Sequence, residues 1–195
     1  MSKIKLNAAS GGGSVSLQAP SSSSNNRVFT LPDVADATMA TLNGISEFDQ
    51  WYLTANKTDN TDITANLLRN DRAGAAAQIG TGMSESSGIF TFPNTGKWLV
   101  ICAAEFTLYD ADNVIINTKV TTNNSSYTTH ARALDGNNGT GERSGGDTSF
   151  SFIDVTDTSQ VKVKFEANSI GTNSSVTGNA GVITTSFLFI RIGDT

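Results

Sequence analysis

The sequence predicts an all-β protein with a short N-terminal arm and one larger β-sandwich. The 195 residues include 22 Ser, 25 Thr and 18 Asn, whereas charged residues make up only 16%. These small polar side chains suit turns and exposed strand faces, and inside helices they compete for backbone hydrogen bonds. Apolar residues also recur at every second position in several segments, with turn-forming residues between those segments. This alternation is typical of strands.

Residues 1–45 form the predicted arm. Apolar and polar residues alternate in three short stretches, which we expect to be strands separated by Gly/Ser-rich linkers. Strands this short cannot enclose a core of their own, so the arm is expected to lie on another subunit or another protein. The candidate anchoring residues are Ile4, Leu6, Val15, Leu17, Val28, Phe29 and Leu31.

Residues 46–195 form the predicted head domain, which begins with a strand at 51–53. Residues 54–82 are ambiguous, because 63–68 fits either a strand or a turn of helix. A strand at 88–92 precedes a Pro-Asn-Thr-Gly turn, and the longest strand follows at 97–109. Its even positions are all apolar, and so are Leu99, Ile101 and Ala103 on the other face, which indicates burial on both faces.

The remaining elements follow the same logic of alternation and turns. The residues Asp-Ala-Asp-Asn at 110–113 predict a tight turn into a return strand at 114–120. A long loop is expected at 135–147, where five glycines occur, and another at 171–181. Strands are expected at 150–153, 160–166 and 182–192. About eight strands joined by turns indicate a sandwich or jelly roll.

The strands at 97–108 and 182–192 carry more apolar surface than one sandwich can bury. Burial between subunits in a closed symmetric oligomer would cover this surplus. The alternative is that a long loop of the same chain covers both strands. The candidate interface residues are Trp51, Leu99, Ile101, Phe187 and Phe189.

Charge and cysteine content argue against several partners. A net charge of −5 and a pI near 4.7 disfavour nucleic acid, whose binding needs a basic surface. No apolar run approaches the ~18 residues of a membrane span, so no membrane partner is expected. Cys102 stands alone, which leaves no internal disulfide. The N-terminus lacks the apolar core of a secretory signal, so we expect synthesis in a cytosol.

The sequence offers little for catalysis. His130 is the single histidine, and no nucleophile elbow, zinc-protease motif or phosphate-binding loop occurs. We therefore predict no enzyme activity, no catalytic residue and no cofactor. Acidic and amide side chains at two turns could offer oxygen ligands to calcium, but such residues are common at turns, so no metal site is predicted. These residues are Asp110, Asp112, Asn113, Asp154 and Asp157.

Residues 88–98, Gly-Ile-Phe-Thr-Phe-Pro-Asn-Thr-Gly-Lys-Trp, resemble a signature of the tumour necrosis factor and complement globular-head superfamily. Trp98 stands where the family pattern has Tyr. The long apolar strand, the segment 155–161 and the Phe-rich last strand follow in the order typical of that superfamily. The resemblance covers residues 47–193. It implies a jelly-roll sandwich that assembles as a compact homotrimer, with aromatic residues of the first and last strands near the three-fold axis.

The arm segments 3–6, 13–20 and 29–33 resemble the N-terminal segments of tailed-phage virion proteins, especially those of marine and cyanobacterial phages. This resemblance implies a virion structural protein assembled in the host bacterial cytoplasm. We expect a capsid decoration or cement protein whose arm grips the major capsid protein or another virion protein. The alternative is a tail-fibre or knob protein that binds host surface glycans through 135–147 and 171–181.

A free lectin-like module is a third hypothesis. Trp51 and Tyr127 could stack on sugars, and the Asn-, Asp- and Gly-rich loops could carry recognition. The simpler interpretation places Trp51 and Trp98 in the core or in a subunit interface.

Overall fold

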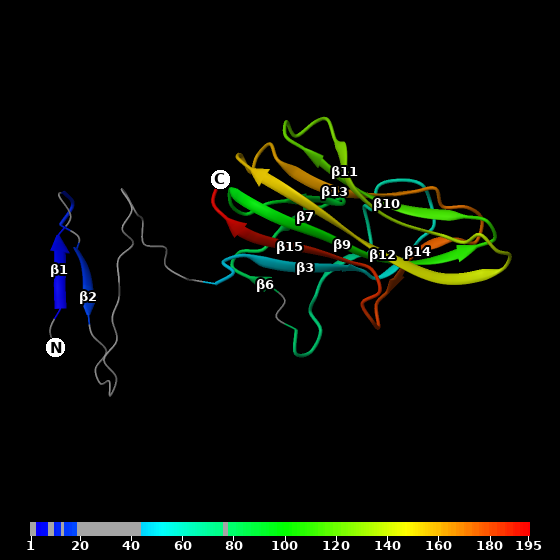
Figure 1. The fold of residues 1–195 in the computed structure, drawn as a ribbon, viewed down its shortest axis with the longest axis horizontal. Helices are drawn as coiled ribbons and strands as arrows, with labels where there is room; N and C mark the ends of the chain where they lie inside the picture. Colours follow the sequence, from blue (N-terminus) through cyan, green and yellow to red (C-terminus); the bar gives the residue numbers. More distant parts are fainter. Residues whose placement is uncertain (1–2, 8–9, 13, 19–43, 76–77) are drawn as a thin grey trace. The chain divides into compact units, whose positions relative to one another are not determined.

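The computed structural model describes residues 3–7, 10–12, 14–18, 44–75 and 78–195. The chain divides into two units, Met1–Leu42 and Asn43–Thr195. Every regular element within the described residues is a β-strand (Figure 1). None of these residues belongs to a helix long and apolar enough to cross a membrane.

The described part of the first unit is a two-stranded antiparallel sheet. It consists of β1 (Lys3–Asn7) and β2 (Ser14–Gln18), joined through Gly11 and Gly12. Both glycines adopt positive φ values, which glycine tolerates and which a tight turn requires. The first two predicted arm strands are therefore confirmed. The candidate anchors Val28, Phe29 and Leu31 lie outside the described residues.

The second unit is a sandwich of two antiparallel sheets (Figure 1). The smaller sheet contains, in spatial order, β11 (Thr128–Gly136), β10 (Asn113–Thr121), β13 (Lys162–Asn168), β8 (Ile89–Thr91) and β7 (Ser84–Ser86). The larger sheet contains β4 (Ala55–Lys57), β14 (Ser175–Asn179), β9 (Gly96–Tyr109), β15 (Ser186–Gly193), β3 (Phe48–Leu53) and β5 (Leu67–Arg69). In that sheet β12 (Glu142–Val155) also pairs with β9, and the short β6 (Gln78–Ile79) pairs with β3.

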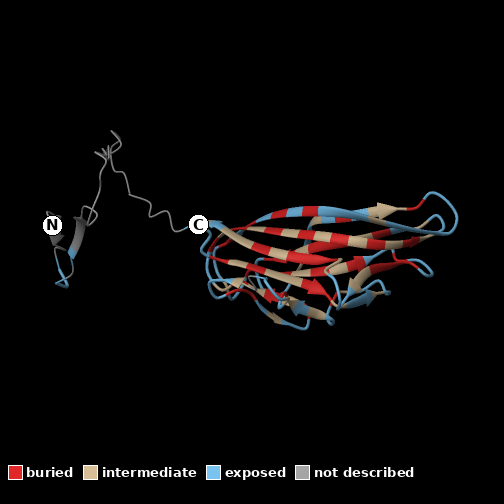
Figure 2. Ribbon diagram, turned by 90° about the horizontal axis from the view of Figure 1, so that it is seen from below, coloured by how far each residue is buried: buried red, intermediate tan, exposed pale blue. Residues whose placement is uncertain are grey.

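Strand β9 organises the larger sheet. Its 14 residues alternate strictly between buried and half-buried, as Figure 2 shows for several strands. One side of β9 pairs with β12 along its whole length, and the other side pairs with β15 and then with β14. The long strand predicted at 97–109 is thus confirmed, but its odd-numbered face is half-buried in a single chain and not buried as predicted.

Aromatic rings fill the space between the two sheets. Phe90 of the smaller sheet has its ring centroid 5.0 Å from that of Phe189 and 5.4 Å from that of Trp51. Phe165 stacks on Phe187 at 4.0 Å across the same gap. Burying a Phe side chain contributes about 1.5–3 kcal/mol, so this cluster is a main source of stability.

The loop predicted at 135–147 is shorter than expected, because β11 extends to Gly136 and β12 begins at Glu142, which leaves only 137–141 as a loop. The glycines that suggested a loop instead allow close approach within the sheet. A Cβ on Gly146 would lie 2.7 Å from the carbonyl oxygen of Ala104 on the paired strand. A Cβ on Gly145 would lie 1.9 Å from the Asp135 carboxylate. Glycine is required here by crowding rather than by a turn.

The described residues of the ambiguous segment, 54–75 and 78–82, contain three short strands, β4, β5 and β6, and no helix. Ile63 is fully buried in the core, and its neighbour Asp62 forms a single β-bridge with Glu166. The predicted loop at 171–181 is only partly a loop, because β14 occupies Ser175–Asn179 within it.

Candidate functional site

The outer face of the larger sheet carries two apolar rows that run across its strands. Residues paired in register project from the same face, so each row is continuous. The first row consists of Ile79, Phe48, Ile190, Leu99 and Phe152. The second row consists of Leu188, Ile101 and Phe150, and the polar Gln50 on β3 ends it. We call these two rows the apolar face.

Strand β12 presents an inverted pattern at the edge of the apolar face. Phe150 and Phe152 point outward and are each 62% exposed. Ser149 and Ser151 point inward, are buried, and their hydroxyls have no hydrogen-bond partner among the described residues. The pairing of β12 with β9 runs through 14 residues without a register shift, which fixes this orientation. A soluble monomer forgoes burial of two Phe rings, about 1.5–3 kcal/mol each.

The predicted interface residues separate into two groups. Leu99 and Ile101 are half-buried members of the apolar face, and their interface role stays a prediction. Phe187 and Phe189 are fully buried in the core of a single chain, so they have no surface to offer a second subunit. Trp51 likewise packs inward, with its ring edge-on to Phe90. The structure thus assigns Phe187 and Phe189 to the core of one chain, whereas the half-buried Trp51 packs against that core and its interface role stays a prediction.

Sequence reasoning missed the most exposed members of the apolar face. The signal for Phe150 and Phe152 is the Ser-Phe-Ser-Phe alternation at 149–152. Such an alternation has one apolar side, but the sequence does not say whether that side faces the core.

Two buried carboxylates hold the start of β3 in place. Asp49 accepts hydrogen bonds from the Trp51 indole (2.9 Å), from Arg69 Nε (3.0 Å) and from the Met83 amide (2.7 Å). Glu47 accepts them from the amides of Thr81 (2.9 Å) and Gly82 (3.1 Å) and from the Asn94 side chain (2.7 Å). Because each carboxylate is fully engaged with neighbours, both serve structure rather than catalysis.

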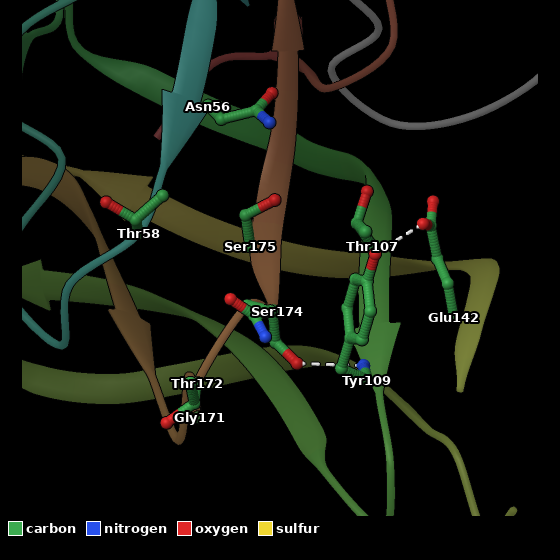
Figure 3. A pocket seen from close by; sticks show the side chains of 10 residues that line it. Asn56, Thr58, Thr107, Tyr109, Glu142, Gly171, Thr172, Ser174 and Ser175 are labelled. Carbon is green, nitrogen blue, oxygen red and sulfur yellow. Dashed lines mark hydrogen bonds between the residues drawn. The ribbon is translucent and has the colours of Figure 1, made fainter. Parts of the chain in front are cut away.

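A polar pocket of about 610 Å³ lies on the same sheet, beyond the apolar face, where β9 ends and β14 begins (Figure 3). The Tyr109 hydroxyl donates to Glu142 Oε2 at 2.5 Å, and this hydrogen bond raises the pKa of Tyr109. The Tyr109 amide donates to Ser174 Oγ at 3.0 Å. The lining residues are Asn56, Thr58, Thr107, Tyr109, Glu142, Gly171, Thr172, Asn173, Ser174 and Ser175.

The pocket draws on both segments predicted to bind glycans. Gly171–Ser175 come from 171–181, and Glu142 comes from 135–147. Tyr127 is elsewhere: its half-buried ring packs under the Lys164 ammonium group, 4.4 Å from the ring centroid. The structure therefore does not bring together Trp51 and Tyr127, the two residues of the lectin hypothesis, in this pocket.

The remaining candidate catalytic and metal-binding residues are exposed on a strand or stabilise turns. His130 is exposed on β11. Asp112 accepts from the Gly171 amide (2.8 Å), and Asp157 accepts from the Ser159 amide (2.8 Å), which are turn-stabilising contacts. Among the described residues, no three His, Cys, Asp or Glu side chains gather as metal ligands would.

The two antiparallel sheets of the second unit form a jelly-roll sandwich like that of tumour necrosis factor proteins. Two crystal structures of murine APRIL, a tumour necrosis factor family protein, are similar to this chain. The structure at pH 5.0 gives a TM-score of 0.51 and 11% identity, and that at pH 8.5 gives 0.50 and 10%. Each comparison covers 75% of this chain and 98% of APRIL. No protein-family model and no curated protein matches the sequence. The expected all-β jelly-roll fold is thus confirmed.

Proposed function

We propose that this chain is a non-enzymatic structural protein that assembles as a homotrimer and is held on a larger particle by its N-terminal arm. The observation that carries the proposal is the exposure of Phe150 and Phe152 beside an apolar sheet face, with serines in the core behind them. An apolar area on one face of a subunit is covered most simply by copies of the same chain in a closed ring.

The particle that we propose is the virion of a tailed phage, assembled in the host bacterial cytoplasm, with the chain as a capsid decoration or cement protein. The described part of the arm supports an anchoring role, since two short strands can add to the sheet edge of a neighbour. The anchoring residues would be Ile4, Leu6, Val15, Leu17, Val28, Phe29 and Leu31. The partner of the arm would be the major capsid protein or another virion protein.

The oligomeric state tests the first half of this proposal. Light scattering after size-exclusion chromatography should give three times the chain mass of 20.4 kDa for the full-length protein. A double substitution, Phe150→Ser with Phe152→Ser, should give the monomer mass. Leu134→Ser removes a similarly exposed apolar side chain from the edge of the other sheet, and it should leave the trimer intact. A monomeric parent protein would overturn the trimer.

Copy number tests the second half. The chain should be present in purified virus particles from the natural source of the sequence, at a level comparable to the major capsid protein. A few trimers per particle would replace the decoration role with a fibre or knob, and absence from particles would overturn the virion role. Deleting residues 2–32 should abolish attachment and leave a soluble trimer. Attachment of the truncated protein would contradict anchoring by the arm.

A further inference from the structure

We propose that the polar pocket lined by Tyr109 and Glu142 binds a neutral saccharide. This inference stands independently of the virion role and of trimer formation, because every group that it uses belongs to one chain.

The chemistry of the pocket wall selects against other ligands. Its side chains are hydroxyls, two carboxamides, one carboxylate and one aromatic ring. None of the lining residues is Lys, Arg or His, so a phosphate or sulfate would find no cation to pair with. None is aliphatic beyond the Thr methyl groups, so a lipid chain would lose more than it gains. A neutral ligand rich in hydroxyl groups matches such a wall.

Three polar groups in the pocket have hydrogen-bonding capacity to spare. Glu142 uses Oε2 to accept from Tyr109, which leaves Oε1 as an acceptor. Asn56 uses Oδ1 to accept from the Gly178 amide at 3.0 Å, which fixes the carboxamide and leaves Nδ2 as a donor. Ser175 is only 3% exposed, lines the pocket, and its hydroxyl has no partner among the described residues. An acceptor, a donor and a hydroxyl in one pocket suit neighbouring hydroxyl groups of a sugar.

Figure 3 shows Tyr109 and Glu142 on one side of the pocket, with Ser174 and Ser175 between them and Asn56. The Tyr109 ring offers an apolar face, which is the surface that the C–H side of a pyranose ring needs. Its hydroxyl is tied to Glu142, so the ring is held in one orientation.

The pocket is also pre-formed. Ser174 connects the loop to β9 through the Tyr109 amide (3.0 Å), and Gly171 is tied to Asp112 (2.8 Å). Asn173, between them, adopts a positive φ of 67°. A ligand would therefore bind without first ordering this loop, which lowers the entropic cost of binding. The volume of about 610 Å³ falls within the usual range for small-ligand sites.

A glycan array tests the proposal with fluorescently labelled full-length protein. The array carries neutral di- to tetrasaccharides of hexoses and N-acetylhexosamines, together with sialylated and sulfated counterparts. We expect binding to a subset of the neutral glycans, followed by titration of the best of them in solution. Tyr109→Ala should weaken that affinity at least about tenfold, because it removes the ring and frees the Glu142 carboxylate.

Two further variants test whether the glycan binds in the polar pocket. Thr172→Trp adds bulk at the exposed rim and removes only one of the wall hydroxyls, and it should also abolish binding. Tyr127→Ala removes a tyrosine outside the pocket and should bind as the parent does. Binding only to acidic glycans, no binding to any glycan, or equal affinity of the parent and both pocket variants would each overturn the proposal. Absence of the chain from purified particles, with glycan binding retained, would instead contradict only the virion role.

Discussion

At the scale of single residues, Asp49 is a position of the larger sheet where we expect a substitution to cost much stability. It is 1% exposed, and its carboxylate connects β3 to Arg69 and to the backbone at Met83. Without this carboxylate, the Arg69 guanidinium, the Trp51 indole N–H and the Met83 amide N–H all lose their shared acceptor. We expect Asp49→Ala to lower the free energy of unfolding by about 3–5 kcal/mol, measured by urea denaturation.

Asp194→Ala is the matched control for that substitution. Asp194 pairs with Arg191 at 2.5 Å, but its side chain is 91% exposed, so the loss should stay within about 0.5 kcal/mol. A similar small loss for Asp49→Ala would show that the buried cluster is not a stabilising element.

Glu166 gives stability a dependence on pH. It accepts hydrogen bonds from Lys119 (2.5 Å) and Asn117 (2.9 Å), and the Lys119 contact is the main cause that holds its pKa below the ordinary 4.5. A depressed pKa means that the ionised form stabilises the folded state above pH 4.5, and that this contribution is lost as the pH falls through the folded-state value.

The variant Glu166→Gln isolates this contribution. Its free energy of unfolding should be about 1 kcal/mol lower than the parent's at neutral pH, and this difference should shrink as the pH falls below 4.5 through the lowered pKa of Glu166. Urea denaturation at several pH values measures the difference. Glu105→Gln removes a carboxylate that has no ion pair among the described residues, and at neutral pH its free energy of unfolding should stay within about 0.5 kcal/mol of the parent's. A difference in the free energy of unfolding between the parent and Glu166→Gln that persists at low pH would show that it does not come from the ionised Glu166 carboxylate.

At the scale of elements, β12 depends on glycine for its close pairing with β9. A Cβ at Gly146 meets a backbone oxygen, which cannot move without displacing β9. We therefore expect Gly146→Ala to lower the free energy of unfolding by about 2 kcal/mol. Gly193→Ala, where a new Cβ meets nothing within 4 Å, should change it by less than about 0.5 kcal/mol. Equal stability of the two variants in urea would show that the strands accommodate the added methyl group.

Strands β9 and β15 show what the sequence could and could not predict. Period-2 alternation was enough to locate β9 and β15, because each is long and bounded by clear turns. It could not decide which side of β15 faces the core, since Phe187 and Phe189 alternate with equally apolar Leu188 and Ile190. Only packing against the second sheet settles that choice, and it placed the phenylalanines inside.

The sequence pointed to two segments of the polar pocket, 135–147 and 171–181, but not to the pocket as a whole, for a different reason. Its walls come from 56–58, 107–109, 142 and 171–175, which meet only when β4, β9, β12 and β14 pair. Ser, Thr and Asn are abundant throughout this sequence, so no local enrichment marks these particular ones.

At the scale of the whole molecule, Cys102 reports on cooperative unfolding. It is fully buried in the middle of β9, and burial raises the pKa of its thiol, so the reactive thiolate is suppressed in the folded state. Labelling with a thiol-reactive chromophore should be at least about a thousandfold slower in the native protein than in urea. Rapid labelling of the folded protein would show local opening of the larger sheet.

The length of β9 sets a distance between two ends of the sandwich. Gly96 begins the strand beside Arg191, whose amide donates to the carbonyl of Glu47, close to where the second unit begins. Tyr109 ends the strand in the polar pocket. Fourteen residues at about 3.3 Å each span about 45 Å. The second unit therefore begins near one end of this strand, and the polar pocket lies at the other end, about one strand length away.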